Sequence, residues 1–240
     1  MDVIAIVQAR MGSTRLPGKV LKKINNRFVL DYVIERLKFS DKINDVILAT
    51  TKDKKDDVLE TYAIEREVRY FRGSEEDVLS RYYHAAKKYG GEIIVRITSD
   101  CPLIDPEIVD NVINKHIDNK ADYTSNVIKR TYPRGLDTEV FNFDVLSEAY
   151  KNANEKYQHE HVTSYMIEHP EKFKLQNIEA KGKLKRPDIR ITVDTKEDFE
   201  LIKKIILHFN NLNFKTDDII GFLDRNPELI EINKNIIQKD

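Results

Sequence analysis

The stretch "VIAIVQARMGSTRLPGK" (Val3–Lys19) joins a short apolar segment to a turn that is crowded with cations and glycines. Val3–Val7 is β-branched except for one alanine, which predicts a buried strand. The turn holds three cations within ten residues, and these would repel one another unless a polyanion bound among them. In a parallel α/β sheet, the loop after the first strand is the commonest place for phosphate. The stretch therefore predicts a parallel α/β fold with a phosphate site behind its first strand.

The first half of the chain repeats this order of a short apolar run followed by an amphipathic one. Strands are predicted at Val3–Gln8, Asp45–Thr50, Val68–Phe71 and Glu92–Thr98, and helices within 28–37, 55–66, 75–89 and 105–117. Such alternation is typical of parallel strands joined by crossover helices. We predict an α/β fold in which a mixed, mainly parallel sheet is flanked by helices.

The pattern loosens after Ala121. The expected elements are a strand, a loop and a strand within 122–144, helices over Val145–Ala153 and about Tyr157–Glu168, a strand pair within 172–180 and 188–194, a helix over 196–209 and a short helical tail. We expect a single domain over residues 1–240, with a substrate or dimerisation segment inserted at about 122–180.

Composition excludes several classes of protein. The 40 basic and 41 acidic residues give a net charge of -1, so no global field draws the chain to nucleic acid or to an anionic membrane. The single cysteine, Cys101, excludes an intrachain disulfide framework and fits a reducing compartment. The opening "MDVIAIVQAR" carries an acid where a signal peptide needs basic residues. We expect a soluble cytoplasmic protein with neither nucleic acid nor membrane as partner.

The loop after the first strand differs from the usual phosphate loops. Gly12 and Gly18 are six positions apart, one more than in the P-loop, and Val20 stands where that loop has its magnesium-binding hydroxyl. The glycines still let backbone amides approach an anion, while Ser13 and Thr14 add donors. The structural alternative is a solvated basic turn whose glycines and proline only separate strand from helix.

Two aspartates follow other predicted strands. In "EIIVRITSDCPLID" an apolar run leads into Asp100, and in "DIRITVDTKEDFE" another leads into Asp194 just before a helix. Magnesium prefers carboxylate oxygens, so the pair is a candidate site for the metal of a bound triphosphate. As alternatives, Asp194 could be only a helix cap, and Asp100 only a turn residue ahead of Pro102.

The motif "QARMGSTRLPGKVL" resembles the signature R-x-x-S-x-R-L-P-x-K of cytidylyltransferases that activate acidic sugars, such as CMP-KDO and CMP-sialic acid synthetases. It is most similar to the SpsF-type branch of spore-coat polysaccharide biosynthesis proteins. The resemblance implies a nucleotidyltransferase fold related to the GT-A glycosyltransferases. "SDCPLID" and "VDTKEDFE" are similar to the two metal motifs, so it also implies magnesium held by Asp100 and Asp194. KDO-type enzymes have an acid at the position of Cys101. The SpsF-like branch has a cysteine followed by proline there, as this chain does.

The motif "FRGSEEDVLSRYYHAA" looks like the nucleotide-side motif of the family, and "YPRGLDTEVF" and "YQHEHVTSYMIEHP" lie in the insertion, where substrate choice is expected. The resemblance and the residue chemistry together give these candidates: for catalysis Arg10, Arg15 and Lys19; for nucleotide binding Gln8, Ala9, Arg10, Gly12, Ser13, Arg15, Lys19, Ser74, Asp77, Arg81 and Thr98; for substrate binding Arg134, Asp137, Glu139, His159 and His161; and for metal Asp100 and Asp194.

Structural or competing interpretations accompany some of these candidates. Asp77 and Arg81 are four apart and could form a plain ion pair within a helix. Cys101 could be a nucleophile with His159 or His161 as its base, although a cysteine at a strand end is usually just a small buried residue. His159 also replaces the arginine that is usual in the branch.

The leading hypothesis is transfer of CMP from CTP, with magnesium, to a sugar acid or sugar phosphate, with release of pyrophosphate. One alternative is a GT-A-like glycosyltransferase that consumes a nucleotide sugar, and another is a non-catalytic nucleotide-binding protein. A homodimer is a family expectation.

Overall fold

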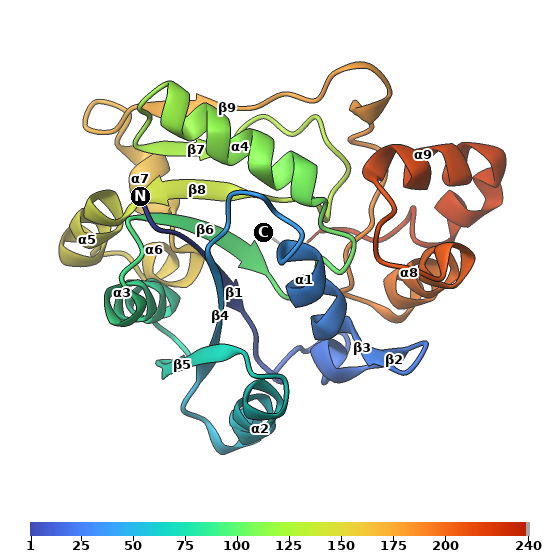
Figure 1. The fold of residues 1–240 in the computed structure, drawn as a ribbon, viewed down its shortest axis with the longest axis horizontal. Coiled ribbons are helices and arrows are strands. Elements are labelled where there is room, and N and C mark those ends of the chain that lie inside the picture. Colours follow the sequence, from blue (N-terminus) through green and yellow to red (C-terminus); the bar gives the residue numbers. More distant parts are fainter. Residues whose placement is uncertain (239–240) are drawn as a thin grey trace.

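A seven-stranded mixed sheet organises the computed structural model, which describes residues 1–238 (Figure 1). The strands are β1 (Val3–Gln8), β4 (Asp45–Thr51), β5 (Arg69–Gly73), β6 (Ile93–Thr98), β7 (Tyr123–Ser125), β8 (Glu139–Asn142) and β9 (Leu175–Asn177). Their order is β5-β4-β1-β6-β8-β7-β9. The first four are parallel, β8 runs antiparallel to both β6 and β7, and β9 is parallel to β7. The predicted mixed, mainly parallel sheet is confirmed.

Alternate residues of β1 enter two different cores. Ala5 and Val7 pack under α1 (Val29–Leu37), α2 (Asp57–Glu65) and α4 (Pro106–Asp118). Ile4 and Ile6 pack on the other face, under α3 (Val78–Tyr89) and α5 (Phe143–Asn152). A parallel strand covered on both faces must be apolar along its whole length, which is why "VIAIV" shows no alternation of polar residues.

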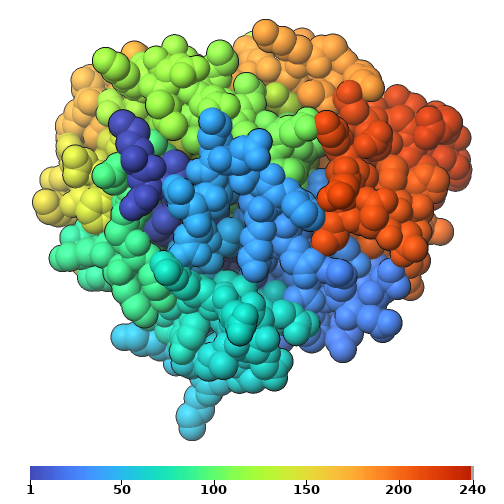
Figure 2. All heavy atoms as spheres, viewed as in Figure 1, coloured from blue at the N-terminus to red at the C-terminus, as the bar shows by residue number. Residues whose placement is uncertain are grey.

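A third apolar cluster lies beneath α8 (Lys196–Phe209) and α9 (Thr216–Arg225). It includes Leu16 and Tyr32, so the C-terminal helices pack against the segment that follows β1. Figure 2 shows the red C-terminal segment directly beside that blue segment. The loop of the first strand is therefore covered by chain that is almost two hundred residues away in sequence.

The predicted strand at 188–194 is wrong as a partner of 172–180. Its only pairing within the described residues is one parallel bridge between Arg134 and Arg190, while β9 pairs with β7. The segment is nevertheless extended. Ile189, Ile191 and Val193 all pack in the cluster beneath α8, and the residues between them face the other way, as in a strand. The alternation of apolar and polar residues predicted an extended backbone but could not identify the segment with which it pairs.

Two further differences concern local backbone. The helix expected over Tyr157–Glu168 is two short helices, α6 (Lys156–His161) and α7 (Ser164–Glu168), separated by Val162 at φ 60°. A small hairpin of β2 (Lys23–Ile24) and β3 (Arg27–Phe28) was not predicted, although its two asparagines at positive φ are residues that tight hairpin turns favour. The helical tail forms α9 and a 3₁₀ turn over Pro227–Ile232.

Candidate functional site

The carboxyl ends of β1 and β6 bring the opening loop and Asp100 to one place. These strands are parallel neighbours in which Gln8 pairs with Thr98, so the loop after each begins at the same edge of the sheet. Asp194 reaches this edge on the extended segment 188–194, where the Val193 amide donates to the Asp100 carbonyl at 2.8 Å. Three segments far apart in sequence thus meet at one end of the sheet.

Lys19 lies between the two aspartates. Its ammonium is 2.9 Å from Asp100 Oδ2 and 2.7 Å from Asp194 Oδ1. Arg15 adds a second cation, with Nη2 at 3.1 Å from Asp194 Oδ2. The cationic loop and the paired carboxylates that the sequence predicted separately therefore form a single cluster.

The pKa values of this cluster follow from burial and its opposite charges. Burial favours the neutral acid of Asp100, but the Lys19 ammonium and a 2.6 Å hydrogen bond from the Thr98 hydroxyl outweigh it and lower the pKa to about 2. Burial alone would lower the pKa of Lys19, yet the two aspartates raise it above its ordinary value. At neutral pH the Asp100 side chain is therefore a carboxylate and the Lys19 side chain an ammonium.

Asp194 is not the N-terminal cap of α8. Thr195 occupies that position and accepts a hydrogen bond from the Asp198 amide at 3.2 Å. Asp198 is fully buried and in turn accepts from the Asp194 amide at 3.0 Å, while Arg190 bridges both carboxylates. Because the cap is supplied by its neighbours, the Asp194 side chain is free to face Lys19.

The donor chemistry of the cluster fits a divalent cation such as magnesium. Two carboxylates converge on a point already occupied by a cationic group, and magnesium commonly uses one or two carboxylates together with substrate phosphates and water. No group of three or more histidine, cysteine or acidic side chains within residues 1–238 could hold a metal alone. Asp100 and Asp194 would hold the ion, with Lys19 turned away from them.

The loop itself is anchored by a residue that sequence reasoning missed. The Met11 amide donates to Asp56 Oδ1 at 2.7 Å, and Asp56 is fully buried with its other oxygen on the Thr51 hydroxyl. Gly18 adopts φ 65°, which glycine reaches without strain. Ser13 Oγ accepts from the Leu16 amide at 3.4 Å, so this hydroxyl partly stabilises the turn.

Arg10 projects from the other end of the loop. Its Nη1 lies 3.3 Å from Glu75 Oε1, and Lys55 contacts the same carboxylate. Neither Lys55 nor Glu75 was a candidate from sequence, because nothing in their local pattern shows that they fold over the loop.

The nucleotide-side candidates surround the start of α3. Asp77 caps this helix through the Ser80 amide at 2.8 Å, and Arg81 donates to the Ser74 carbonyl at 2.9 Å. Within the described chain no Asp77–Arg81 ion pair forms, so the alternative that these two residues only form an ion pair within a helix is wrong. Gln8 Oε1 and Arg81 Nε are buried and have no hydrogen-bond partner within residues 1–238. A bound polar ligand could supply the missing partners.

A cavity of about 490 Å³ opens beside the aspartates. Seven predicted residues line it: Thr98, Asp100, Arg134, Asp137, Glu139, His161 and Asp194. His159 does not line it; the structure places this imidazole 3.1 Å from Asp77 and 3.1 Å from the Ala153 carbonyl. Residues two apart on a helix point in different directions, which separates His159 from His161.

Two lining acids are already paired. Asp137 forms a bidentate ion pair with Arg130 at 2.6 and 2.7 Å, a cavity residue that was not predicted. Glu139 is buried and accepts from the Tyr123 and Thr163 hydroxyls as well as from Arg96. Glu139 thus links three side chains from different elements in the wall of the cavity.

Within residues 1–238, Arg134 is the arginine of this cavity that has no ion-pair partner. Its side chain makes no hydrogen bond or ion pair with any residue in the described range 1–238. Burial and the nearby Arg130 lower its pKa from the ordinary arginine value. An anionic group entering the cavity would therefore find an unpaired guanidinium.

Cys101 shows none of the features of a nucleophile. The thiol is 3% exposed and lies 3.3 Å from the Thr98 hydroxyl. Burial and two neighbouring acids raise its pKa well above the ordinary thiol value. Within the described chain the thiol hydrogen-bonds with Thr98 and Asp100 and with neither histidine, so the alternative of a Cys–His pair is not supported.

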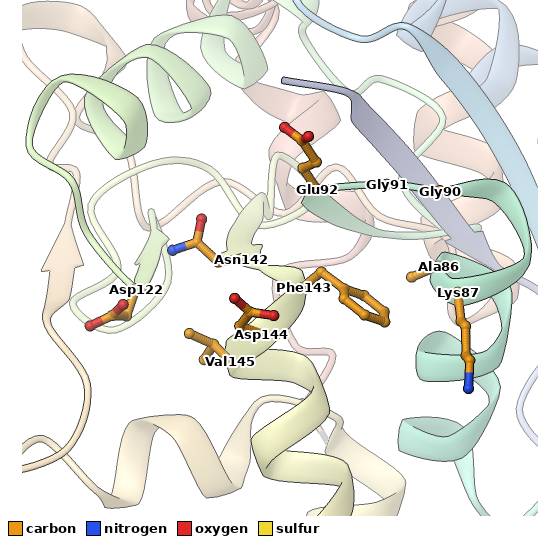
Figure 3. A pocket seen from close by; sticks show the side chains of 10 residues that line it. All are labelled: Ala86, Lys87, Gly90, Gly91, Glu92, Asp122, Asn142, Phe143, Asp144 and Val145. Carbon is orange, nitrogen blue, oxygen red and sulfur yellow. The ribbon is translucent and has the colours of Figure 1, made fainter.

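A second cavity of about 620 Å³ lies at the opposite end of the sheet. Its walls come from the α3–β6 and β8–α5 junctions, and Ile93 pairs with Asn142 at the amino end of β6 (Figure 3). The carboxylates of Glu92, Asp122 and Asp144 lie around it. None of the predicted site residues lines it.

No helix within residues 1–238 is long and apolar enough to cross a bilayer.

Several known proteins are similar to this chain. One relative is "Uncharacterized protein MJ1063" of Methanocaldococcus jannaschii. The two sequences are 46% identical over 100% of this chain and 97% of the relative. It is 38% identical, over 95% of this chain and 96% of the relative, to the spore coat polysaccharide biosynthesis protein SpsF of Bacillus subtilis. The solved structure of a cytidylyltransferase from Leptospira borgpetersenii superposes with a TM-score of 0.92 at 37% identity, covering 100% of both chains. The nucleotide-diphospho-sugar transferase-like fold predicted from sequence is thereby confirmed. Residues 4–221 match the Cytidylyltransferase family, and the chain belongs to that family.

Proposed function

We propose that the protein transfers CMP from CTP to an acidic or phosphorylated sugar, with release of pyrophosphate. The observation that carries the proposal is the contact of Lys19 with both Asp100 and Asp194, beside Arg15. A triphosphate has the charge and length to replace these internal ion pairs. Membership of the cytidylyltransferase family favours this reaction over glycosyl transfer from a nucleotide sugar.

In this proposal the cations of the loop act on the phosphates. Lys19 and Arg15 leave the aspartates and bind the phosphate chain, where they stabilise the charge that develops on the leaving pyrophosphate. Magnesium held by Asp100 and Asp194 would neutralise phosphate charge and lower the proton affinity of the acceptor oxygen. The buried Thr98 hydrogen bond keeps the Asp100 carboxylate oriented and ionised.

The nucleoside is assigned to the residues around the start of α3. Gln8 offers an unpartnered buried acceptor and Arg81 an unpartnered buried donor, within the described chain. A pyrimidine carries both donors and acceptors on its edge and could satisfy them.

The acceptor is assigned to the cavity of about 490 Å³. Arg134 would bind the anionic group of the acceptor, while the Arg130–Asp137 pair and His161 would contact its hydroxyls. A carboxylate or a phosphate would each suit this arginine. The relative named for spore coat polysaccharide biosynthesis supports a role in supplying activated sugars for a surface polysaccharide.

We further propose that the enzyme acts in the cytoplasm, where CTP is made, and as a homodimer through the inserted segment. Apolar side chains are exposed there at Ile128 (44%) and Ile167 (36%). Light scattering should give twice the chain mass, and Ile128→Asp should shift the protein toward the monomer. A monomer in the wild type at micromolar concentration would refute the dimer.

The function is tested by pyrophosphate release. Each of the four ribonucleoside triphosphates is combined with a panel of acidic, phosphorylated and neutral sugars, with and without magnesium. We expect release only with CTP, magnesium and an anionic sugar, and expect Arg134→Met to raise the acceptor KM more than it lowers kcat. Formation of a nucleoside diphosphate from a nucleotide sugar would indicate the glycosyltransferase instead, and tight CTP binding without turnover would indicate a binding protein.

A further inference from the structure

Lys55 lies over the glycine of the opening loop. A Cβ atom built on Gly12 would be 3.3 Å from both Cε and Nζ of Lys55, so the ammonium closely approaches the loop backbone. Lys55 belongs to the 3₁₀ turn Lys54–Asp56 that follows β4, a parallel neighbour of β1. A fourth cation therefore reaches the loop from a different element.

Buried contacts fix the turn that carries Lys55. The next residue, Asp56, is fully buried and holds the Met11 amide at 2.7 Å. Asp53 caps the turn by accepting from the Lys55 amide at 3.1 Å. Because Asp56 ties the turn to the residue before Gly12, the position of Lys55 over the loop follows from the fold.

A carboxylate already occupies the space between Lys55 and the loop. Lys55 Nζ lies 2.7 and 2.9 Å from the two oxygens of Glu75, and Arg10 Nη1 lies 3.3 Å from one of them. A built Gly12 Cβ would be 3.5 Å from the same Glu75 oxygen. An anion thus rests against the glycine, held by two cations from separate elements.

We propose that Lys55 binds the phosphate chain of the nucleotide, and that Glu75 holds its place and competes with that phosphate. The inference rests on the proposed function, since it requires a nucleoside triphosphate as ligand. Arg15 and Lys19 engage the aspartate end of the loop, so Lys55 and Arg10 serve phosphates farther from that end. Glu75 turns away when a phosphate enters.

The two partners of this ion pair should therefore have opposite effects. Loss of Lys55 removes a charge-assisted contact to phosphate, whereas loss of the Glu75 charge removes a competitor. If the pair were only structural, both losses would act in the same direction.

Calorimetric titration with CMP, CDP and CTP, with magnesium and without acceptor, separates these possibilities. For Lys55→Met we expect CTP affinity to fall about tenfold, the equivalent of one charge-assisted hydrogen bond, and CMP affinity to change less than about twofold. For Glu75→Gln we expect CTP to bind about threefold more tightly or better, with CMP unchanged.

The neighbouring residues supply matched controls. Lys54 and Glu76 are exposed and face no partner in the described chain, so Lys54→Met and Glu76→Gln should leave all three affinities unchanged. Equal losses for CMP and CTP in Lys55→Met, or weaker CTP binding in Glu75→Gln, would overturn the role of Lys55. A wild-type chain that binds none of the three nucleotides would overturn the proposed function together with this inference.

Discussion

Lys19 occupies the position between Asp100 and Asp194 that a divalent cation would need. Two positive charges cannot share that space at about 3 to 4 Å without a cost of several kcal/mol. In the absence of nucleotide the lysine should therefore oppose metal binding, and a triphosphate that draws Lys19 away should promote it.

This competition predicts a gain in metal affinity when the lysine is removed. In Lys19→Met, nucleotide-free Mn²⁺ binding, followed by the electron paramagnetic resonance of the free ion, should strengthen about tenfold or more. Turnover should fall about a hundredfold because one preorganised cation is lost. Arg10→Met is the control, since Arg10 pairs with Glu75 and not with the aspartates. Unchanged Mn²⁺ binding in Lys19→Met would show that the lysine does not occupy the metal position.

Cys101 gives a prediction that depends on pH. Its pKa is raised well above the ordinary value, first by burial and then by Asp100 and Asp137, so the thiol stays protonated at pH 8. Iodoacetamide should leave the native protein unmodified at pH 8 and label it fully in urea, as intact mass would report. Cys101→Ala should keep turnover within about threefold of wild type, because a buried thiol acts as a small apolar residue. Rapid native labelling together with loss of activity would restore the nucleophile hypothesis.

At the scale of elements, the extended segment 188–194 presents Asp194 without belonging to the sheet. The Ile191 amide donates to the Arg134 carbonyl at 2.8 Å, and the Arg134 amide donates to the Ile189 carbonyl at 2.9 Å. This close approach requires Gly135, which has φ 106° and whose missing Cβ would lie 2.5 Å from the Ile191 carbonyl oxygen.

Gly135→Ala should therefore destabilise the fold and weaken the site together. We expect a loss of about 2 to 4 kcal/mol in the free energy of unfolding, from the strained φ and the backbone clash, measured by urea denaturation. Gly182→Ala is the matched control, since Gly182 also has positive φ, but apart from its chain neighbours no atom of residues 1–238 lies within 4 Å of its built Cβ. Its cost should be only about 1 to 2 kcal/mol. Equal losses in the two variants would mean that the contact with Ile191 is unimportant.

The elements differ in how well the sequence could predict them. Apolar runs predicted β1, β4 and β6 closely, because buried parallel strands carry a strong local signal. The break at Val162 had no such signal, since a fully buried valine at φ 60° is imposed by tertiary packing. The partner of 188–194 was likewise decided by loops remote in sequence. Local patterns predict conformation better than they predict pairing.

At the scale of the whole molecule, topology explains which site residues could be foreseen. Arg15, Lys19 and Asp100 follow strands of a parallel sheet, so their shared edge could be inferred from the order of elements. Lys55 also follows a parallel strand, β4, but only coordinates show that its side chain lies over Gly12, and Arg130 meets the site through packing between distant segments. Their positions needed coordinates, and their local sequence carries no signal of function.

A ligand should raise the thermal stability of the whole fold, because the site is built from segments that lie between residues 10 and 194 of the chain. A ligand that binds only the folded state stabilises it by about 2.7 kcal/mol at a hundred times its Kd, which for a chain of this length raises the melting temperature by about 5 to 10 °C. CTP with magnesium should give this shift in differential scanning fluorimetry, and either component alone should give a smaller one. Asp194→Asn, which leaves the Thr195–Asp198 cap of α8 in place, should lose the synergy between CTP and magnesium while still responding to CTP. If magnesium and CTP raised the melting temperature independently in the wild type, the two would not meet at one site, and the paired aspartates would have another role.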